Sequence, residues 1–457
     1  MDKKEIIIIV TACIGGLLQA YFANITPIIL PQMAKVFGLS NILQNWVTNI
    51  FILTMGVCAL PLSKVASKYG VKRTFYWSLI FTLVGTIGTI FANSIFLLFL
   101  FRIIQGIGGG GLCVASVLII SESLPEKIWG KVFGLYLALV YIGVSLTTVI
   151  GGVLSYHLGW TFSFYLFIPL IIINIILLYF IKDEWVLDAE ERFDLKGSVI
   201  YAIAFSVLIF GFSILNTILG LIVTIIGVLC FVLFGKLELK ISNPVFDMNL
   251  FKDNMFLSGN ITSILSFLAT FVVTTLVNYN LQYIQGYNSI TAGLVILVLP
   301  FMMVIFAPIA GLFTNKIDDE IVSALGMGIV TVGLFLLIFL DKSTSLSYIF
   351  LSLFLQGVGF GLFATSNMNI IMCNVPDKDN PMASSAIAAM RILGQTGSMG
   401  ILTVVFALVM GDVMIIPSNY PALISSTQIT MLIVTIVGVL TVLVSLWGLK
   451  SKNTKIV

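Results

Sequence analysis

Two arginines lie within long apolar segments of this sequence, and each has a glutamine one helical turn away. Arg102 precedes Gln105 by three residues and Arg391 precedes Gln395 by four, so each pair shares a helix face. A cation within an apolar helix costs several kcal/mol unless it faces protein or water. Both arginines are therefore expected to face a cavity and to shape the energetics of a bound substrate or proton. Two alternatives stay open: Arg102 snorkels to the membrane interface, or Arg391 anchors a cytoplasmic helix end.

A second set of polar residues recurs at steps of four, at Thr270, Thr274, Asn278 and Gln282. A polar stripe of this kind would be costly against lipid, so it should face a cavity or another helix. Further candidates for lining the same cavity are Gln19, Asn24, Asn45, Asn49 and Asn367, with Phe22, Trp46 and Phe271 as adaptable apolar walls. Helix-to-helix hydrogen bonding is the alternative use of the polar members.

The sequence lacks the residue patterns for metal binding, hydrolysis, disulfide bonding and ATP binding. The single histidine, His157, excludes histidine metal clusters and Ser-His-Asp hydrolysis. The five cysteines lie inside apolar runs without a CxxC pair, so no metal site or disulfide is expected. The glycine-rich run at 106–111 lacks the strand and lysine of a phosphate-binding loop, and the chain has no GxxxxGK[ST] segment, so ATP is excluded as the energy source. No cofactor is expected.

Composition indicates where these residues operate. Only 9% of the 457 residues are charged and 59% are hydrophobic, with a mean hydropathy of +1.13, whereas soluble domains carry roughly 25% charged residues. The chain is therefore expected to be a polytopic membrane protein surrounded by lipid. A net charge of +3, with the basic residues spread along the chain, argues against nucleic-acid binding.

Fourteen windows are long and apolar enough to span a bilayer, which requires about 20 residues each. They are 5–30, 42–62, 74–92, 95–120, 132–154, 161–181, 197–215, 218–234, 256–282, 291–313, 321–340, 347–372, 385–410 and 428–448. With the amino terminus inside, nineteen of the 23 basic residues fall in cytoplasmic segments and two in external ones. This bias predicts an all-α protein with both termini cytoplasmic, located in the plasma membrane.

Two charged linkers, 182–196 and 236–254, divide the spans into six, two and six. The predicted organisation is a six-helix bundle over 1–181, a linker with two inserted helices over 182–240, and a second six-helix bundle over 241–457. The segment GLFTNKID at 311–318 echoes SKVASKYG at 63–70, each after the second helix of its bundle. Such a weak repeat is typical of transporters built from two halves.

Three segments carry a family resemblance: residues 45–75, the RIIQGIGGGG run at 102–111, and RILGQTGSMG at 391–400. Together they resemble the major facilitator superfamily, and the six-two-six plan is similar to its fourteen-helix drug:proton antiporter branch, the QacA/EmrB-like exporters. The resemblance implies two six-helix bundles plus two extra helices. It also implies a conformational gating loop at Ser67, Lys68, Gly70, Lys72 and Arg73, for which simple positive-inside topology is the alternative, and helix-packing glycines at Gly106, Gly143, Gly151 and Gly152.

Three hallmarks of proton-coupled export are altered relative to that branch. Phe22 stands where a first-helix carboxylate is common, Ser67 matches the loop aspartate, with Asn315 as its counterpart in the second half, and Thr147 and Thr148 replace the Gly-Pro of the fifth-helix motif. None of the twenty carboxylates lies in the middle of a span; Glu122 and Asp412 lie at helix ends. Proton coupling is therefore left open, and the lack of a buried carboxylate favours neutral, zwitterionic or amphipathic anionic substrates over dications.

The sequence thus predicts a secondary active transporter, monomeric and not an enzyme, that exports drugs or other hydrophobic compounds by alternating access, as in antibiotic resistance. A facilitator or importer of a small solute or lipid-like metabolite is the main alternative. A membrane transferase would require clustered His, Asp or Glu at a membrane face, and the acidic runs at 188–194 and 318–320 contain no histidine. A receptor or scaffold would have little use for a two-half repeat.

Overall fold

A computed structural model describes residues 3–38, 41–187, 194–215, 217–241, 244–313, 316–411 and 417–456, and every regular element in these ranges is helical. The helices preceding the first linker are α1 (Lys3–Asn24), α2 (Thr26–Phe37), α3 (Asn41–Tyr69), α4 (Val71–Ile90), α5 (Ile95–Ser123), η1 (Glu126–Ile128), α6 (Trp129–Leu158), α7 (Phe162–Tyr165) and α8 (Ile168–Phe180).

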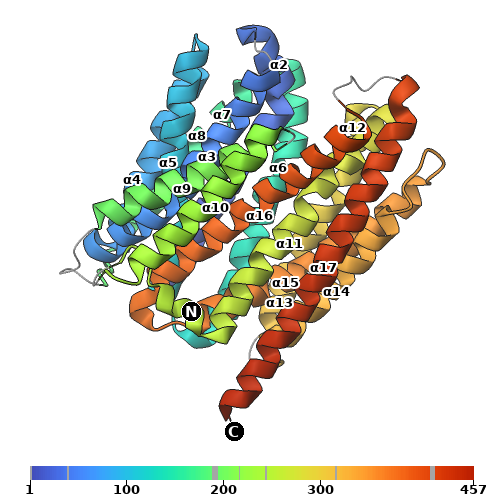
Figure 1. Ribbon diagram of the computed structural model, residues 1–457. Coiled ribbons are helices and arrows are strands. Elements are labelled where there is room, and N and C mark those ends of the chain that lie inside the picture. The colour runs from blue at the N-terminus through green and yellow to red at the C-terminus, as the bar shows by residue number, and fades with distance from the viewer. Residues whose placement is uncertain are drawn as a thin grey trace. The chain divides into compact units, whose positions relative to one another are not determined.

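The helices that follow, labelled with the others in Figure 1, are α9 (Leu195–Ser213), α10 (Ile218–Glu238), η2 (Met248–Lys252), α11 (Asn254–Tyr279), η3 (Asn280–Ile284), α12 (Ser289–Ile296), α13 (Val298–Phe313), α14 (Asp319–Leu337), α15 (Leu346–Cys373), η4 (Asp377–Asp379), α16 (Asn380–Val409), η5 (Pro417–Asn419) and α17 (Tyr420–Ile456). Each of the fourteen predicted spans coincides with one of these helices or with two consecutive ones, which confirms the all-α polytopic fold.

Thirteen helical segments of the described chain are long and apolar enough to cross a membrane. The predicted span 74–92 falls outside these thirteen and corresponds to α4. This helix has 20 residues, begins with Lys72 and Arg73 in its first turn, and carries serine and threonine along one side. Its length suffices for a span, and its polarity comes from the face that it packs against its neighbours.

Two predicted spans contain a break. The window 5–30 is divided at Ile25, where α1 ends and α2 begins with Thr26 and Pro27. Proline has no backbone N–H and clashes with the preceding turn, so it favours the start of a new helix at this point. In the span 256–282, α11 passes directly into the π-helix η3. A wider turn of this type changes which side chains share a face.

The chain packs as two compact units, and the boundaries between them cut three helices, α9, α10 and α16. The first unit comprises Met1–Ala202, Leu237–Asp247 and Val375–Ala389. Within it, α5 packs along α3 and α4, and α1 packs against α5, α6 and α8. Glycines permit this closeness: a Cβ on Gly85 of α4 would lie 2.6 Å from the Gln105 backbone nitrogen, and a Cβ on Gly106 of α5 would lie 2.9 Å from the Phe51 carbonyl oxygen.

The second unit comprises Ile203–Lys236, Met248–Asn374 and Met390–Val457. Within it, α15 packs along α13 and α14, and α17 packs against α11 and α14. A Cβ on Gly333 of α14 would lie 2.6 Å from Cγ of Gln356, and a Cβ on Gly357 of α15 would lie 2.4 Å from the Leu299 carbonyl oxygen. Close backbone approach at small residues is the usual way in which membrane helices associate.

The same packing pattern therefore occurs twice in the chain. Gly106 of α5 lies against the carbonyl group of Phe51 on α3. Gly357 of α15 lies in the same way against the carbonyl group of Leu299 on α13, so the two glycines correspond. The register that pairs Phe51 with Leu299 also pairs the first residues of the segments 63–70 and 311–318. The internal repeat predicted from those two segments is thus present in the packing of both units.

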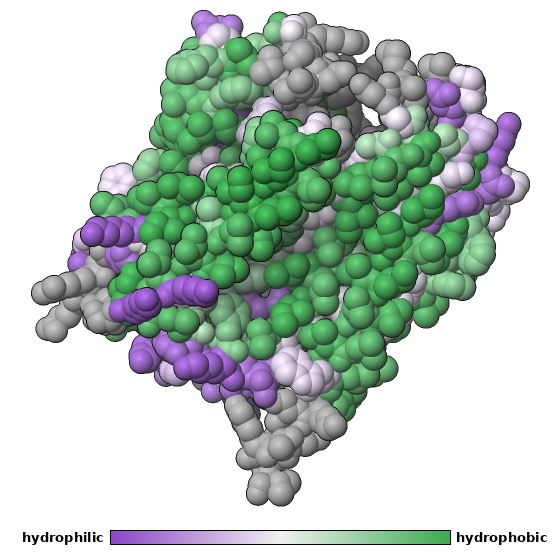
Figure 2. Space-filling model, in the orientation of Figure 1, coloured by the Kyte–Doolittle hydropathy of each residue, from purple (hydrophilic) through white to green (hydrophobic). Residues whose placement is uncertain are grey.

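The surface is suited to lipid. Figure 2 shows hydrophobic residues (green) along the lengths of the helices and hydrophilic residues (purple) gathered near helix ends. Large apolar side chains are widely exposed, among them Tyr179 at 84% and Ile218 at 82%. Exposed apolar area on this scale would make a soluble protein aggregate, whereas a bilayer covers it. The chain is a multi-pass membrane protein.

Candidate functional site

Arg102 is completely buried in the interior of the first unit. It lies on α5 with 0% exposure, and its guanidinium carbon lies 4.6 Å from the centroid of the Phe51 ring on α3. Its Nη1 donates to Oε1 of Gln105 over 2.6 Å, while Nε and Nη2 have no hydrogen-bond partner. The side chain therefore faces protein, stabilised by one hydrogen bond and one cation–π contact, and two of its nitrogens, Nε and Nη2, are left without an acceptor.

A chain of hydrogen bonds fixes Gln105. Its Nε2 donates to Oγ1 of Thr86 on α4 over 2.8 Å, and that hydroxyl donates in turn to the Thr82 carbonyl over 2.6 Å. Because the Thr86 hydroxyl proton is already donated to Thr82, the hydroxyl oxygen can only accept, and its partner must be the NH2 group of Gln105. This orientation leaves Oε1 of Gln105 pointing at Arg102.

No carboxylate of the described chain pairs with Arg102. Phe22, at the position where the resemblance implies a first-helix carboxylate, is 1% exposed. Its ring packs 6.2 Å from that of Phe164 and 6.1 Å from that of Phe167. A charged group would be poorly solvated in this aromatic cluster, so the packing itself explains why a phenylalanine is accommodated there.

Gln19 of α1 lies against the same face of α3 as Arg102. Its Nε2 donates to Sδ of Met55 over 3.3 Å, and Met55 is one helical turn from Phe51. Gln19 is 2% exposed, and its Oε1 has no hydrogen-bond partner. Two predicted site residues thus lie against one face of α3, and each has polar atoms without a hydrogen-bond partner: an acceptor oxygen on Gln19 and donor nitrogens on Arg102.

The other predicted residues of this unit lie nearer its margins. Asn24 is half-buried and donates to the Ala20 carbonyl over 2.8 Å, which is local helix bonding beside the break at Ile25. Trp46 and Asn49 are half-buried on α3, and the Asn45 side chain lies outside the described residues.

The polar stripe of the second unit is half-buried on α11 and η3. Oγ1 of Thr270 donates to the Ser266 carbonyl over 2.8 Å and Oγ1 of Thr274 to the Phe271 carbonyl over 3.3 Å. Nε2 of Gln282 donates to Oδ1 of Asn278 over 2.7 Å, from within the π-helix. Phe271 is also half-buried. Helices with a π-turn frequently carry functional residues there.

Asn367, Arg391 and Gln395 occupy two other helices of the second unit. Asn367 of α15 is 4% exposed and makes helix-to-helix hydrogen bonds, accepting from Thr262 over 2.7 Å and donating to Ser263 of α11 over 2.8 Å. Arg391 and Gln395 are half-buried on α16. α16 packs on α11: Oγ of Ser398 on α16 accepts from the backbone N–H of Val272 on α11 over 3.1 Å.

The predicted gating loop forms the turn between α3 and α4. Gly70 has φ 113°, in the region that favours glycine. Oε1 of Glu184 accepts from the backbone N–H groups of Lys72 over 2.9 Å and Arg73 over 3.4 Å. This carboxylate therefore caps the first turn of α4, where the helix dipole favours negative charge. The sequence analysis missed Glu184, although an acid directly after the sixth predicted span was its visible signal.

The segment after α8 continues along the same turn. The Val71 N–H donates to the Trp185 carbonyl over 2.9 Å, and the Leu187 N–H donates to the Ser67 carbonyl over 3.0 Å. Nζ of Lys72 donates to the Ile181 carbonyl, and Lys68 lies 5.5 Å from the Tyr69 ring centroid. The five predicted loop residues are thus brought together, with 181–187 laid against them.

The predicted packing glycines lie at close helix contacts. A Cβ on Gly143 of α6 would lie 2.6 Å from the Leu17 carbonyl oxygen of α1, and a Cβ on Gly151 would lie 2.6 Å from Cδ1 of Ile25. The surroundings of Gly152 and of the Thr148 side chain lie outside what the structure describes. Thr147 is buried and donates to the Val144 carbonyl over 2.5 Å.

Two carboxylates are held at helix ends in the first unit. Oε1 of Glu122 accepts from Nδ2 of Asn380 over 2.8 Å. Glu238, which the sequence analysis did not single out, is 2% exposed and interacts electrostatically with Lys64 of α3, itself 6% exposed. Asp412 and Asn315 lie outside the described residues.

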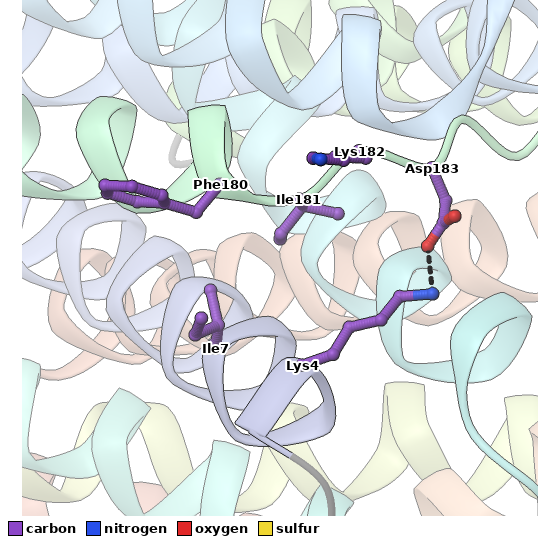
Figure 3. A pocket seen from close by; sticks show the side chains of 6 residues that line it. All are labelled: Lys4, Ile7, Phe180, Ile181, Lys182 and Asp183. Carbon is purple, nitrogen blue, oxygen red and sulfur yellow. Dashed lines mark ion pairs between the residues drawn. The ribbon is translucent and has the colours of Figure 1, made fainter.

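Two pockets lie on the first unit. One has a volume of about 320 Å³ and is lined by Lys4, Ile7 and residues 180–183. Figure 3 shows Lys4 reaching from the start of α1 to form an ion pair with Asp183. The other, of about 420 Å³, lies over α3, α4 and α5. Neither contains Arg102 or Gln105.

Comparison with known proteins agrees with this fold. The chain is 27% identical over 393 residues to the riboflavin transporter RibZ of Clostridioides difficile, covering 86% of each chain. It is 28% identical over 419 residues to the multidrug resistance protein Stp of Mycobacterium tuberculosis, covering 89% of this chain and 77% of Stp.

Solved structures share the fold at lower identity. The proton:xylose symporter XylE matches with a TM-score of 0.67 at 16% identity, over 96% of this chain and 94% of that one. The human organic anion transporter MFSD10 matches with a TM-score of 0.64 at 12% identity, over 96% and 100%. Residues 12–235 and 259–456 match the family model described as Major Facilitator Superfamily. On the combined evidence of its helices, its internal repeat and these matches, the chain belongs to the Major Facilitator Superfamily.

Proposed function

We propose that the protein is a secondary active transporter that exports hydrophobic or amphipathic compounds by alternating access, and that Arg102 binds an anionic or acceptor group of the substrate. The observation that carries this proposal is the buried guanidinium with two unpartnered nitrogens, which pairs with no carboxylate among the residues that the structure describes. Leaving buried donors unsatisfied costs roughly 1–3 kcal/mol each. A substrate that supplies acceptor oxygens recovers this cost, and a cationic substrate does not.

The substrate class follows from this charge balance. Neutral compounds with acceptor groups, zwitterions and amphipathic anions are favoured over dications, which would be repelled by Arg102. Phe51, which contacts Arg102, and Met55, which contacts Gln19, provide apolar side chains on α3, as expected for an adaptable pocket. Among the relatives, one is named a multidrug resistance protein and another a riboflavin transporter, so the proposal extends to flavin-like neutral solutes.

The wider assignments are part of the same proposal. We assign 1–181 and 241–457 to two six-helix bundles and 182–240 to a linker with two inserted helices, as in the fourteen-helix QacA/EmrB-like branch. Both termini are placed in the cytoplasm of a plasma-membrane monomer. The polar stripe on α11, together with Asn367, Arg391 and Gln395, completes the substrate-lining set, and the α3–α4 turn acts as the gate.

A facilitator or importer of a small solute is the second candidate, and Phe22 is the observation that favours it. An aromatic cluster occupies the position where the branch commonly has a carboxylate, and intramembrane proton carriers are usually Asp, Glu or His. Proton coupling, if present, would use Glu122 or Asp412 at a helix end.

The test is transport by the purified chain in proteoliposomes, with and without an imposed pH gradient. Riboflavin, the anion carboxyfluorescein and the dication methyl viologen are compared in the protein and in Arg102→Ala, with Lys342→Ala as a control cation outside the site. We expect transport of the first two compounds and a loss of at least tenfold in Arg102→Ala. Methyl viologen as the best substrate would contradict the substrate class. Gradient-independent transport would favour the facilitator over the exporter.

A further inference from the structure

A groove on the outer surface of the first unit has no role in the proposed transport site. It has a volume of about 420 Å³ and lies over α3, α4 and α5. Leu62 and Val65 of α3 and Ile107 of α5 form its apolar wall. Beside the groove, α5 packs closely on α4 and α3: a Cβ on Gly111 would lie 1.9 Å from Oγ of Ser78 and 3.3 Å from Cδ1 of Leu62.

One end of this groove is cationic and aromatic, and the other continues into an apolar helix face. Tyr69, Arg73 and Trp77 line the end nearest the α3–α4 turn, and Lys68 lies over the Tyr69 ring. From Trp77, which is 58% exposed, the exposed face of α4 continues through Phe81, Val84, Ile87 and Phe91. Aromatic residues at a helix end followed by an apolar face mark the headgroup and acyl levels of a bilayer.

Arg73 is available to a further anion. Its Nε forms an ion pair with Oε2 of Glu184 at 3.7 Å, beyond hydrogen-bond distance, and its side chain is 71% exposed, so the guanidinium can still reach a second anion. Glu184 already accepts backbone N–H groups of Lys72 and Arg73 through its other oxygen. The polar groups of the groove floor are also satisfied, since the hydroxyls of Thr74 and Ser78 donate to carbonyls one turn back on α4.

We propose that this groove binds one anionic phospholipid, whose phosphate pairs with Arg73 and whose acyl chain lies along Val65, Ile107 and Phe81. Charge complementarity points to the occupant: the rim carries Arg73 and Lys68, and Glu184, the carboxylate that the described residues place against Arg73, is engaged by the start of α4. Arginine presents a planar fork that matches phosphate oxygens, and a single basic residue near an anionic headgroup changes binding by about fivefold. This site is independent of the substrate site at Arg102.

The experiment uses the fluorescence of Trp77 in nanodiscs. Brominated phosphatidylglycerol and brominated phosphatidylcholine are compared as quenchers at equal mole fraction, and the Trp77→Phe variant identifies the Trp77 contribution. We expect phosphatidylglycerol to quench Trp77 at about fivefold lower mole fraction than phosphatidylcholine. Arg73→Gln should abolish this preference, Arg73→Lys should retain part of it, and Lys131→Gln, which removes an exposed cation of α6, should leave it unchanged.

A second variant tests the groove independently of charge. Val65→Phe fills the apolar wall, and it should weaken quenching by both lipids while Arg73 remains. Equal quenching by the two lipids in the unmodified protein, or a preference that survives Arg73→Gln, would overturn the proposal. A concentration-dependent dimer that Val65→Phe disrupts would instead assign the groove to a second copy of the chain.

Discussion

Arg102 of α5 stacks on Phe51 of α3, with 4.6 Å between the guanidinium carbon and the ring centroid. Both side chains are completely buried. The contact joins a permanent charge to an apolar face without a counterion, so it stabilises the arginine only partly, by about 1–2 kcal/mol. The desolvation cost of the buried Arg102 charge is therefore only partly offset within the resting protein. The first two predictions test this.

Replacing the arginine should make the protein more stable and less active. In Arg102→Met, a flexible apolar side chain fills the site and removes two unsatisfied donors, so we expect the thermal unfolding midpoint to rise by about 2–4 °C for each kcal/mol gained. Transport of carboxyfluorescein should fall at least tenfold. Thermal unfolding and proteoliposome transport measure the two effects. A fall in the midpoint would show that Arg102 is fully compensated in the resting protein.

Supplying a counterion should remove the preference for anions. Gln105→Glu places a carboxylate where Oε1 of Gln105 now accepts from Nη1 of Arg102 at 2.6 Å. Neutralised in this way, Arg102 no longer favours anions, so anion transport should fall by about tenfold while riboflavin transport changes little. Gln105→Leu serves as the comparison, since it removes the hydrogen bond without adding charge and should leave the preference for anions intact. An unchanged anion-to-riboflavin ratio in Gln105→Glu would contradict the proposed role.

The repeat predicts that equivalent glycines are equally sensitive to substitution. A Cβ on Gly85 or Gly333 would lie 2.6 Å from Gln105 or Gln356, whereas one on Gly328 of α14 would meet nothing within 4 Å. Gly85→Ala and Gly333→Ala should each destabilise the protein by about 1–3 kcal/mol through overpacking. Gly328→Ala should be neutral or stabilising, because alanine is the better helix former. Thermal unfolding of the three variants measures this directly, and equal midpoints would refute it.

The cap of α4 should matter for the stability of the α3–α4 turn. Glu184→Ala removes the acceptor of two backbone N–H groups at the helix start, and the loss of a helix cap costs about 1 kcal/mol. Hydrogen exchange at residues 71–73 should become faster. Glu126→Ala, which removes an exposed acid elsewhere, is the control. Unchanged exchange in Glu184→Ala would show that the contacts of Trp185 and Leu187 hold the turn alone.

Much of the fold follows from the sequence for physical reasons. A spanning helix must be apolar over most of its length, so hydropathy locates thirteen of the segments, and α4, which carries a polar face, is the one that falls outside them. The break at Ile25 escaped this reasoning because a hydropathy window averages over a change of backbone direction, although Pro27 was visible. The π-helix at Asn280–Ile284 has no comparable signal, since its wider turn depends on contacts made after folding.

The site was less accessible than the fold. Arg102 and Gln105 stood out because polar residues are costly in apolar helices, and they do interact. Their further partners, Phe51 and Thr86, carry no such signal, because an aromatic ring and a threonine are ordinary in membrane helices. Glu184 caps α4 from 112 residues away from Lys72, and only the three-dimensional arrangement brings the two together.

A buried carboxylate at the end of α10, near a buried lysine of α3, gives the last prediction. Glu238 is 2% exposed and Lys64 is 6% exposed, and the two interact electrostatically. Each single variant removes this electrostatic interaction, and Glu238→Leu also leaves the Phe246 backbone N–H without its acceptor. Glu238→Leu and Lys64→Met should therefore each destabilise the protein by about 1–3 kcal/mol, with the larger loss in Glu238→Leu. The double variant should recover the part of this loss that comes from the interaction between the two charges, while the Phe246 N–H stays unsatisfied. Thermal unfolding of the four proteins forms a double-mutant cycle. Additive losses in the double variant would mean that the two charges are stabilised separately and do not depend on each other.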